Sequence, residues 1–457
     1  MTETAATALD QDLLAIASGV VERAEAGEDI DVMVARSRST SVRVYDGEVE
    51  AFTSAQSFGL GVRVIQGGRQ GFAHAGSLDP DVVADALAQA RDNVGFAEPD
   101  PAVGLAEPDG VEAVLHDHWN PDILEITAED KIARALDLER ITRGLDPRVS
   151  GVRMAVWSDS AGETAYAASN GIRVTDRGTS CAVGVQPMAR EGDETQIGYA
   201  GDATRDANAL DLEKVAREAV SKATRLLGAT KPASARIPIV LEPKLAATFF
   251  GIISGMLDGE SVLKGRSPFA ERVGGQIASP LVTLVDDPTR AESLAADSYD
   301  GEGLACRRNP LIVDGVLHGF LHNSYTGRRS GTASTGSAVR GSRSLPGVGA
   351  QVILLATPSG APGRDDVIAG IDHGLFVNSL AGLHSGVNPV SGDFSVGADG
   401  LLIRDGELAE PVREITLAST LQRLLLDVIA VADDGEWLPS GDLLSTVVIG
   451  DVAMSGA

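Results

Sequence analysis

A buried-type strand runs directly into the most apolar helical stretch of this chain. Ile237 to Leu241 reads IPIVL, and Glu242-Pro243 then breaks the strand where proline is suited to open a helix. Apolar residues recur at helical spacing through Leu245 to Leu257. That segment is shorter than the roughly 20 residues that span a bilayer. The pattern therefore predicts a core helix that follows a buried strand.

A chain of 457 residues is too long for one ordinary domain, so we expect two. The segment Leu227 to Ala235 has small residues, a proline and no periodicity, as is typical of a linker. We predict an N-terminal α/β domain over residues 1–230 and a C-terminal β-rich domain over residues 236–457. The expected fold class is α+β.

Strand meanders followed by helices dominate residues 1–230. The first 31 residues read as an amphipathic helix, and Asp46-Gly47 between alternating runs predicts a hairpin. The first meander is predicted to have strands at 31–36, 41–45, 49–53, 57–65 and 70–75 and a helix at 79–93. The second is predicted to have strands at 164–169, 172–175, 179–185 and 195–200 and a helix at 210–227, preceded by a helix at 128–143. This repetition indicates an internal duplication, two halves of one continuous sheet, or coincidence between two Gly-rich meanders.

The C-terminal domain is predicted to consist mostly of short strands and turns. Such spacing predicts a mostly antiparallel, barrel-like sheet around the one buried helix. A further helix is expected only at Ile415 to Ile429.

The net charge of −27 argues against nucleic acid and against anionic membrane surfaces, which both attract clustered Lys and Arg. It is also a common solubility device. The N-terminus has no basic start and no apolar run of the signal-peptide type. Cys181 and Cys306 lie far apart and form neither a disulfide framework nor a zinc cluster. We therefore expect a cytoplasmic protein.

The strand and helix at 237–257, with Leu257-Asp258-Gly259 and Gly265-Arg266-Ser267, resemble the start of the C-terminal domain in the TldD/PmbA family. Further matches follow in order along nearly the whole chain, and their order and spacing carry the resemblance. They include Tyr299 to Gly303, Ser334 to Arg340 and Asn388 to Ser395.

In the catalytic branch of that family, the resemblance implies a helix with H-E-x-x-x-H, which supplies two zinc ligands and a catalytic glutamate. The matching positions here are Phe250, Gly251 and Gly255, and none can bind a metal or move a proton. No histidine occurs from Trp119 to Leu317, and the tail Asp433 to Ala457 lacks that branch's cysteine ligand. The chain thus resembles the PmbA (TldE) branch, which implies no catalytic residue and no metal in this chain.

The resemblance implies a catalytically silent subunit of a TldD/TldE-type zinc peptidase that acts on unfolded or leader peptides. Zinc is then expected in a TldD-like partner, and activity only in its presence. The first alternative is a stand-alone, homo-oligomeric module that holds extended peptides by strand addition without catalysis. The second is an enzyme whose chemistry is not placed. Homo- and hetero-oligomers both remain open.

The most basic patch of this acidic chain combines Arg328, Arg329 and Arg340 with the hydroxyl of Ser334. Guanidinium groups beside hydroxyls bind carboxylates. We predict that these residues, together with Asn388, contact an acidic substrate end or a partner. His116 and His118 are predicted to lie in a surface loop, and Asp297 to Gly303 to form a structural turn.

Overall fold

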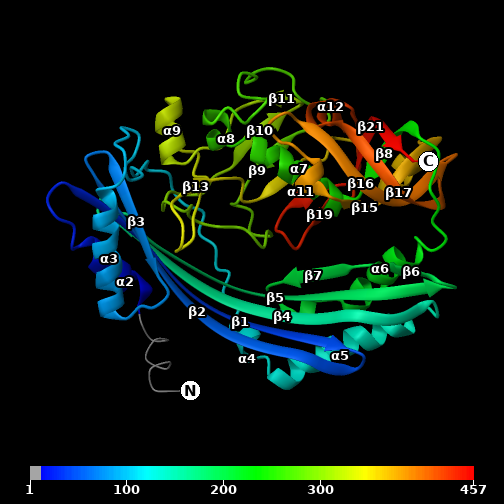
Figure 1. Cartoon of the computed structure of the whole chain (residues 1–457), viewed down its shortest axis with the longest axis horizontal. Coiled ribbons are helices and arrows are strands. Elements are labelled where there is room, and N and C mark those ends of the chain that lie inside the picture. The colour runs from blue at the N-terminus through cyan, green and yellow to red at the C-terminus, as the bar shows by residue number, and fades with distance from the viewer. Residues whose placement is uncertain (1–11, 457) are drawn as a thin grey trace.

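The structure is a computed structural model that describes residues 12–456. A long curved sheet with helices on its outer side forms one unit, and a β-rich unit lies against its concave side (Figure 1). Within the described part of the chain, no helix is long and apolar enough to cross a membrane. Residues 1–11 of the predicted N-terminal helix lie outside the described residues, and the remainder forms α2 (Leu13–Val21), capped by the Asp12 carboxylate.

One antiparallel sheet crosses the whole N-terminal unit in the order β3-β2-β1-β4-β5-β6, with β7 also paired to β5. Asp46 and Gly47 form the predicted hairpin turn, with φ of 52° and 78°. The predicted strands 31–36 and 41–45 are one strand, because the polar segment between them stays paired with both neighbours. The strands are β1 (Glu28–Tyr45), β2 (Glu48–Gln66), β3 (Arg69–Ala75), β4 (Val149–Ala168), β5 (Arg173–Glu191), β6 (Glu194–Ile197) and β7 (Ala200–Thr204).

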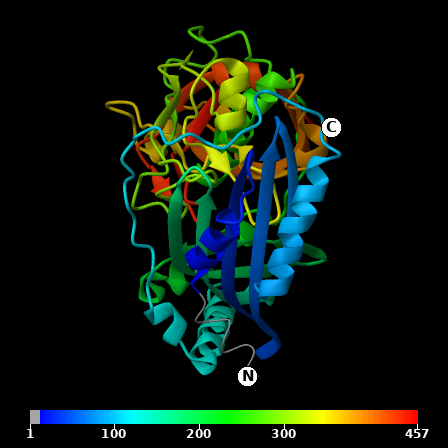
Figure 2. The same cartoon turned by 90° about the vertical axis from the view of Figure 1, so that its left-hand side faces the viewer.

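Helices cover the convex face of this sheet (Figures 1 and 2). Val32, Val34 and Val42 of β1 are buried in the two clusters that the helices complete. Ser37 and Ser39 point to the other face and are exposed. The helices, besides α2, are α3 (Pro80–Val94), the short α4 (Asp122–Glu125), α5 (Ala128–Gly144) and α6 (Leu212–Thr224). The Thr127 hydroxyl caps α5 by accepting a hydrogen bond from the Asp130 amide.

The sheet consists of two halves with similar orders of elements: α2-β1-β2-β3-α3, then α5-β4-β5-β6-β7-α6, where β6 and β7 both pair with β5 as β3 pairs with β2. They meet where β1 pairs with β4. A Cβ added at Gly71 would collide with the Ala90 carbonyl of α3, and one at Gly198 would collide with the Ala219 carbonyl of α6. Each helix therefore crosses its half at an equivalent glycine, and the predicted repetition is two halves of one continuous sheet.

Five strands close a barrel in the C-terminal unit, because β17 pairs with both β16 and β21. Only β8 and β15 run parallel within it, and β18 extends the sheet beyond β21. The strands are β8 (Ala235–Leu241), β15 (His373–Ala381), β16 (Asp393–Arg404), β17 (Glu407–Thr420), β18 (Val428–Val431) and β21 (Val447–Ser455).

A second sheet of six short strands, in the order β11-β10-β9-β14-β20-β19, flanks the barrel, and β12 pairs with β13 nearby. These strands are β9 (Leu284–Asp286), β10 (Asn309–Val313), β11 (Val316–Leu317), β12 (Ala338–Val339), β13 (Gly347–Val348), β14 (Ile353–Leu355), β19 (Glu436–Trp437) and β20 (Leu443–Leu444). Short helices lie between the elements of this unit: α8 (Gly259–Leu263), α9 (Ser324–Ser330), α10 (Arg364–Ala369) and α11 (Leu383–Gly386).

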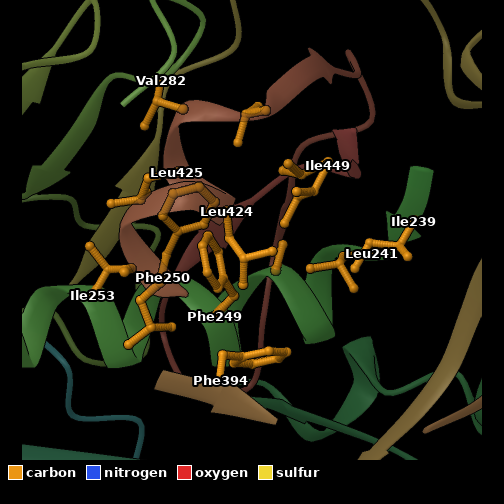
Figure 3. Packing of buried hydrophobic residues seen from close by; sticks show 14 of the residues in the cluster. Ile239, Leu241, Phe249, Phe250, Ile253, Val282, Phe394, Leu424, Leu425 and Ile449 are labelled. Atoms are coloured by element: carbon orange, nitrogen blue, oxygen red, sulfur yellow. The ribbon is translucent and has the colours of Figure 1, made fainter. Parts of the chain in front are cut away.

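The predicted core helix is α7 (Pro243–Met256), and proline opens it as expected. Phe249, Phe250 and Ile253 point toward Leu424 and Leu425 and form the centre of the largest buried cluster (Figure 3). The strand and helix that open the C-terminal unit therefore organise its core, which confirms the α+β class with a barrel around one buried helix.

The helix predicted at 415–429 is wrong in its first part. Ile415 and Leu417 belong to β17, where buried and less buried side chains alternate. Only α12 (Leu421–Leu426) is helical, and β18 follows it. The apolar run in α12 conceals the change from a period of two to a helical period.

Candidate functional site

Helix α7 has one buried face and one open face. Phe250 is fully buried, and its ring meets that of Phe249 edge to face at a centroid distance of 5.1 Å. Gly251 and Gly255 are exposed, and a Cβ added at either would have no atom within 4 Å. No backbone among the described residues therefore packs against this glycine face.

A buried cluster of charges joins the two units. Asp31 of β1 accepts a hydrogen bond from Arg63 of β2 (Nε to Oδ2, 2.9 Å) and another from Arg340 of the C-terminal unit (Nη1 to Oδ1, 2.6 Å). Burial acts to raise the pKa of Asp31, but the charges of Arg340 and Arg63 outweigh it and hold the pKa below its usual value. The Arg340 guanidinium also lies 5.8 Å from the Tyr166 ring centroid. An ionised carboxylate on the concave face of β1 thus links the N-terminal sheet to the C-terminal unit.

The other predicted contact residues also have partners within the chain. Arg328 donates to the carbonyls of Ala102, Leu105 and Gly104 at 2.7, 3.0 and 2.9 Å. Arg329 pairs with Asp100 at 3.2 Å. The structure brings these two arginines and Arg340 to the junction of the two units. Their contact with a substrate or partner stays a prediction.

Ser334 and Asn388 lie in local turns. The Ser334 hydroxyl donates to the His322 carbonyl at 3.1 Å. Asn388 is exposed, and its side-chain oxygen accepts from the amides of Val390 and Ser391. Asn388 is not brought together with the arginines by any recorded contact, and its predicted role also stays a prediction.

A cleft of about 890 Å³ opens where α6 meets the start of α7. Several of its charges are paired: Glu218 accepts from Lys222 and Lys244 at 2.7 and 2.8 Å, and Glu242 pairs with Arg364 at 3.1 Å. The cleft therefore presents both signs of charge to solvent.

A second cavity, of about 400 Å³, lies between the concave sheet face and the turn predicted at 297–303. Burial, reinforced by the nearby Asp176, raises the pKa of Asp297 to about 7. Burial and the charge of Glu302 likewise raise the pKa of Asp300 to about 7. Asp300 accepts hydrogen bonds from the amides of Glu302, Leu304 and Ala338, as suits a structural turn.

His116 and His118 lie in the segment that follows the C-terminal end of the first half. Their rings stack at a centroid distance of 5.0 Å, and His118 is buried rather than on the surface as predicted, because its backbone bridges to Gly178 of β5. Among the residues described, no group of three or more His, Cys, Asp or Glu side chains is placed to hold a metal.

Three known protein domains match consecutive parts of the chain. They are PmbA/TldA metallopeptidase domain 1 over residues 30–94, the central domain over 121–227 and the C-terminal domain over 234–456. The chain belongs to the PmbA/TldD family of metallopeptidases.

Individual relatives in the PmbA/TldD family match over nearly their full length. The chain is 27% identical to "Metalloprotease PmbA" of Escherichia coli O157:H7, over 95% of this chain and 91% of that one. It is 26% identical to "Metalloprotease TldD homolog" of Haemophilus influenzae, over 89% and 86%. The crystal structure of TldE from Thermococcus kodakarensis superposes with a TM-score of 0.85 at 26% identity, over 94% of this chain and 97% of that one.

The residues available on α7 do not fit a PmbA/TldD zinc site at the positions assigned by the resemblance. Phe250 places a ring in the core, and Gly251 and Gly255 carry no side chain. None of the three supplies a nitrogen, sulfur or oxygen donor. We derive no catalytic step through a metal at this helix.

Sequence reasoning missed Asp31, Arg63 and Tyr166. The signal was present, because Asp31 and Arg63 each interrupt an apolar strand at a position that would otherwise be buried. Charged residues are almost never fully buried unless they are paired, so two such residues in neighbouring strands predict a buried ion pair. The third member, Arg340, comes from the other unit and has no local signal.

Proposed function

We propose that this chain is the catalytically silent, TldE-type subunit of a two-component zinc peptidase in which a TldD-like partner holds the zinc. The observation that carries the proposal is the open face of α7, where the family position for metal ligands has two bare glycines. The bond-breaking step then belongs to the partner. This chain supplies a wall of the cavity that orients an unfolded or leader peptide and excludes bulk water.

Two further observations support this assignment. The relatives include proteins named for both branches, PmbA and TldD. The charged cleft beside α7 offers groups that suit peptide termini and side chains. We place the complex in the cytoplasm, because Cys181 and Cys306 are buried free thiols, as expected in a reducing compartment.

The test is hydrolysis of an unstructured peptide by this chain, by a TldD-like protein and by their mixture, each with and without a chelator. We expect no turnover and substoichiometric zinc in the isolated chain, and higher turnover in the mixture than in the partner alone. Chelator-sensitive turnover by this chain alone, unchanged by the partner, would refute the proposal.

Gly255 provides a matched pair of variants for the same assay. Gly255→Leu places a large side chain on the open face, where an added Cβ has no atom within 4 Å, so folding should persist while the mixture loses most of its added activity. Gly255→Ala should keep that activity and stabilise the helix by about 0.5–1 kcal/mol. Equal activity of the two variants would show that the glycine face is not part of the peptide cavity.

The stand-alone peptide-binding module is the second candidate, and the concave sheet face favours it. Its centre carries only small residues in register across four strands, and two pairs of hydroxyls bond across it, Ser37 with Ser57 at 2.7 Å and Ser160 with Ser180 at 3.1 Å. Such a surface offers small side chains and hydroxyl groups to an extended chain. Tight peptide binding by the isolated chain, with no effect on any TldD-like protein, would favour this candidate.

A further inference from the structure

The two outer long strands of the N-terminal sheet are unequally covered. On β2, the strand β3 pairs only with Leu60 to Gln66. On β5, the strand β7 pairs with Cys181 to Val185, and β6 with Met188 to Glu191. Each long strand therefore leaves one stretch of backbone without a strand on its outer side, which is Glu48–Gly59 on β2 and Arg173–Ser180 on β5.

Chain positions on the two strands can be matched through their glycines. Gly61 and Gly184 both lie beneath an aromatic ring, that of Phe72 in the first half and that of Tyr199 in the second. Counting back six residues from each glycine matches Ala55 with Gly178. These two residues mark the centres of the equivalent edges.

The chain itself covers the edge at Gly178. His118 forms a parallel bridge to Gly178, and its carbonyl accepts the Thr179 amide at 3.0 Å. The Thr179 hydroxyl accepts the Asn120 amide at 2.8 Å. In the second half, an extended segment of the same chain thus pairs with the outer edge of β5.

The edge at Ala55 has no such cover among residues 12–456, since no other segment forms a recorded backbone hydrogen bond with Val49 to Phe58. Every residue from Glu48 to Ser57 is exposed, and Phe52 keeps 44% of its surface accessible. Natural proteins protect such edges with lysine, proline or other charges. Ala51 to Gly59 contains none of these. A long unprotected edge of this kind is a template for another strand.

The sequence of this edge is complementary to itself. Phe52 to Phe58 reads F-T-S-A-Q-S-F, which is nearly the same in both directions. Antiparallel pairing of two copies about Ala55 would place Phe52 opposite Phe58, Thr53 opposite Ser57 and Ser54 opposite Gln56. No like charges would face each other, because Glu48 and Glu50 fall outside the paired segment. A two-fold interface has this property, since residue i meets j while j meets i.

We propose that the Phe52–Phe58 edge of β2 pairs antiparallel with the same edge of a second copy of this chain, with the two-fold axis at Ala55. The two sheets then continue into one another across the interface. The cross-strand phenylalanine pairs cover the aromatic surface that is exposed in the single chain. A seven-residue strand pair is a small interface, so the dimer is a weak one.

Sedimentation of the full chain over a wide concentration range tests the proposal. The mass should rise from that of one chain, 47.2 kDa, toward twice that value. Ala55→Lys should raise the dimer dissociation constant about fivefold or more, because two lysines then face each other on the axis. Ser39→Lys is the matched control, since Ser39 is the β1 neighbour of Ala55 on the same exposed face but away from the edge. A mass that stays at one chain, or a dimer equally affected by both variants, would overturn the proposal.

Two further measurements give a result even if a variant folds poorly. A mixture of Ala55→Lys with Ala55→Glu should associate where each variant alone does not, and folded variants that fail to associate on mixing would overturn the proposal. Hydrogen exchange at Val49 to Phe58 should slow as the wild-type concentration rises. Protection independent of concentration would mean that the chain covers its own edge, and protection that appears only with a TldD-like protein would assign the edge to that partner. Both outcomes would overturn self-pairing.

Discussion

The two halves of the N-terminal sheet repeat one arrangement of strands and helices but differ at their edges. At Gly178 the second half is covered by the chain's own segment through His118, whereas Ala55 at the equivalent position of the first half is open. The repeated part is internal, where a helix crosses a glycine at Gly71 or Gly198. The two halves are therefore alike where a helix packs closely on the sheet, and they differ at the strand edges that other chain segments can contact.

The halves also differ in how they hold the C-terminal unit. The first half uses the buried pair Asp31 and Arg63, which recruits Arg340. The same counting from the matched glycines places Met154 and Gln186 at the corresponding positions of the second half. Among the described residues, charged contacts of the second half with the other unit, such as Glu218 with Lys244 and Glu194 with Arg413, are partly exposed, so only the first half has a fully buried charged anchor.

The largest expected effect comes from removing that anchor. Asp31→Ala leaves two buried guanidinium groups without their carboxylate and should lower the free energy of unfolding by about 3–5 kcal/mol. Denaturant unfolding measures the loss, and Met154→Ala is the control from the second half, with a smaller expected loss. A loss below about 1 kcal/mol in Asp31→Ala would show that the anchor is solvated and that the halves do not differ in this respect.

Substitution of the two crossing glycines should reveal the shared design. Gly71→Ala and Gly198→Ala each force a methyl group against a helix carbonyl and should each cost about 1–3 kcal/mol. Thermal or urea unfolding of the two variants checks the match. If one variant were as stable as the wild type, the equivalence of the two helix crossings would be refuted.

A pH-dependent difference is expected where the second half faces the 297–303 turn. There Asp176 lies near Asp297, whereas the matched residue of the first half is Thr53. Because the folded pKa of Asp297 is about 7 and its ordinary value is 3.8, its contribution to stability is complete below pH 3.8 and is lost as the pH rises through 7. Asp297→Asn cannot ionise, so it should be more stable than the wild type at pH 8 by on the order of 1 kcal/mol.

Unfolding curves at pH 4 and pH 8 measure this effect. The advantage of Asp297→Asn should vanish at pH 4, where the wild-type carboxyl is protonated in the folded state. An advantage of the same size at both pH values would attribute the change to packing rather than to ionisation.

The smallest expected effect concerns only residues 116–120, the segment that covers the edge of β5 at Gly178. Thr179→Val removes the hydroxyl that accepts the Asn120 amide, so local opening of residues 116–120 should become easier by about 1 kcal/mol, with global unfolding unchanged. Hydrogen exchange of the Asn120 amide reports this opening. Gln56→Val at the matched position has no covering segment to release and should leave exchange in the first half unchanged.

Much of the fold could be predicted from local sequence. Alternating runs around Asp46-Gly47 specify the hairpin, Pro243 and the apolar period specify α7, and Thr127 marks the start of α5. The continuity of β1 could not be predicted in the same way, because the polar strand residues 37–41 lack an apolar pattern. Their pairing comes from neighbours that are distant in sequence.

The site was harder to predict, for a similar reason. The sequence places bare glycines on α7, but only the structure shows that their face is open. The arginines that were predicted to contact a substrate or partner also contact carboxylates and backbone carbonyls of the N-terminal unit, which the local sequence did not indicate. Arg328 and Arg340 find partners more than 200 residues away, beyond any local spacing rule.

The closure of the barrel has a consequence for the order of folding. β8 opens the C-terminal unit, yet it pairs with β21, which is formed more than 200 residues later in the chain. During synthesis, the N-terminal sheet has all its strands when α6 emerges, while β8 and α7 must wait for Val447–Ser455. Because contacts between such distant segments form slowly, the exposed apolar face of α7 is the part of a nascent chain most in need of a chaperone.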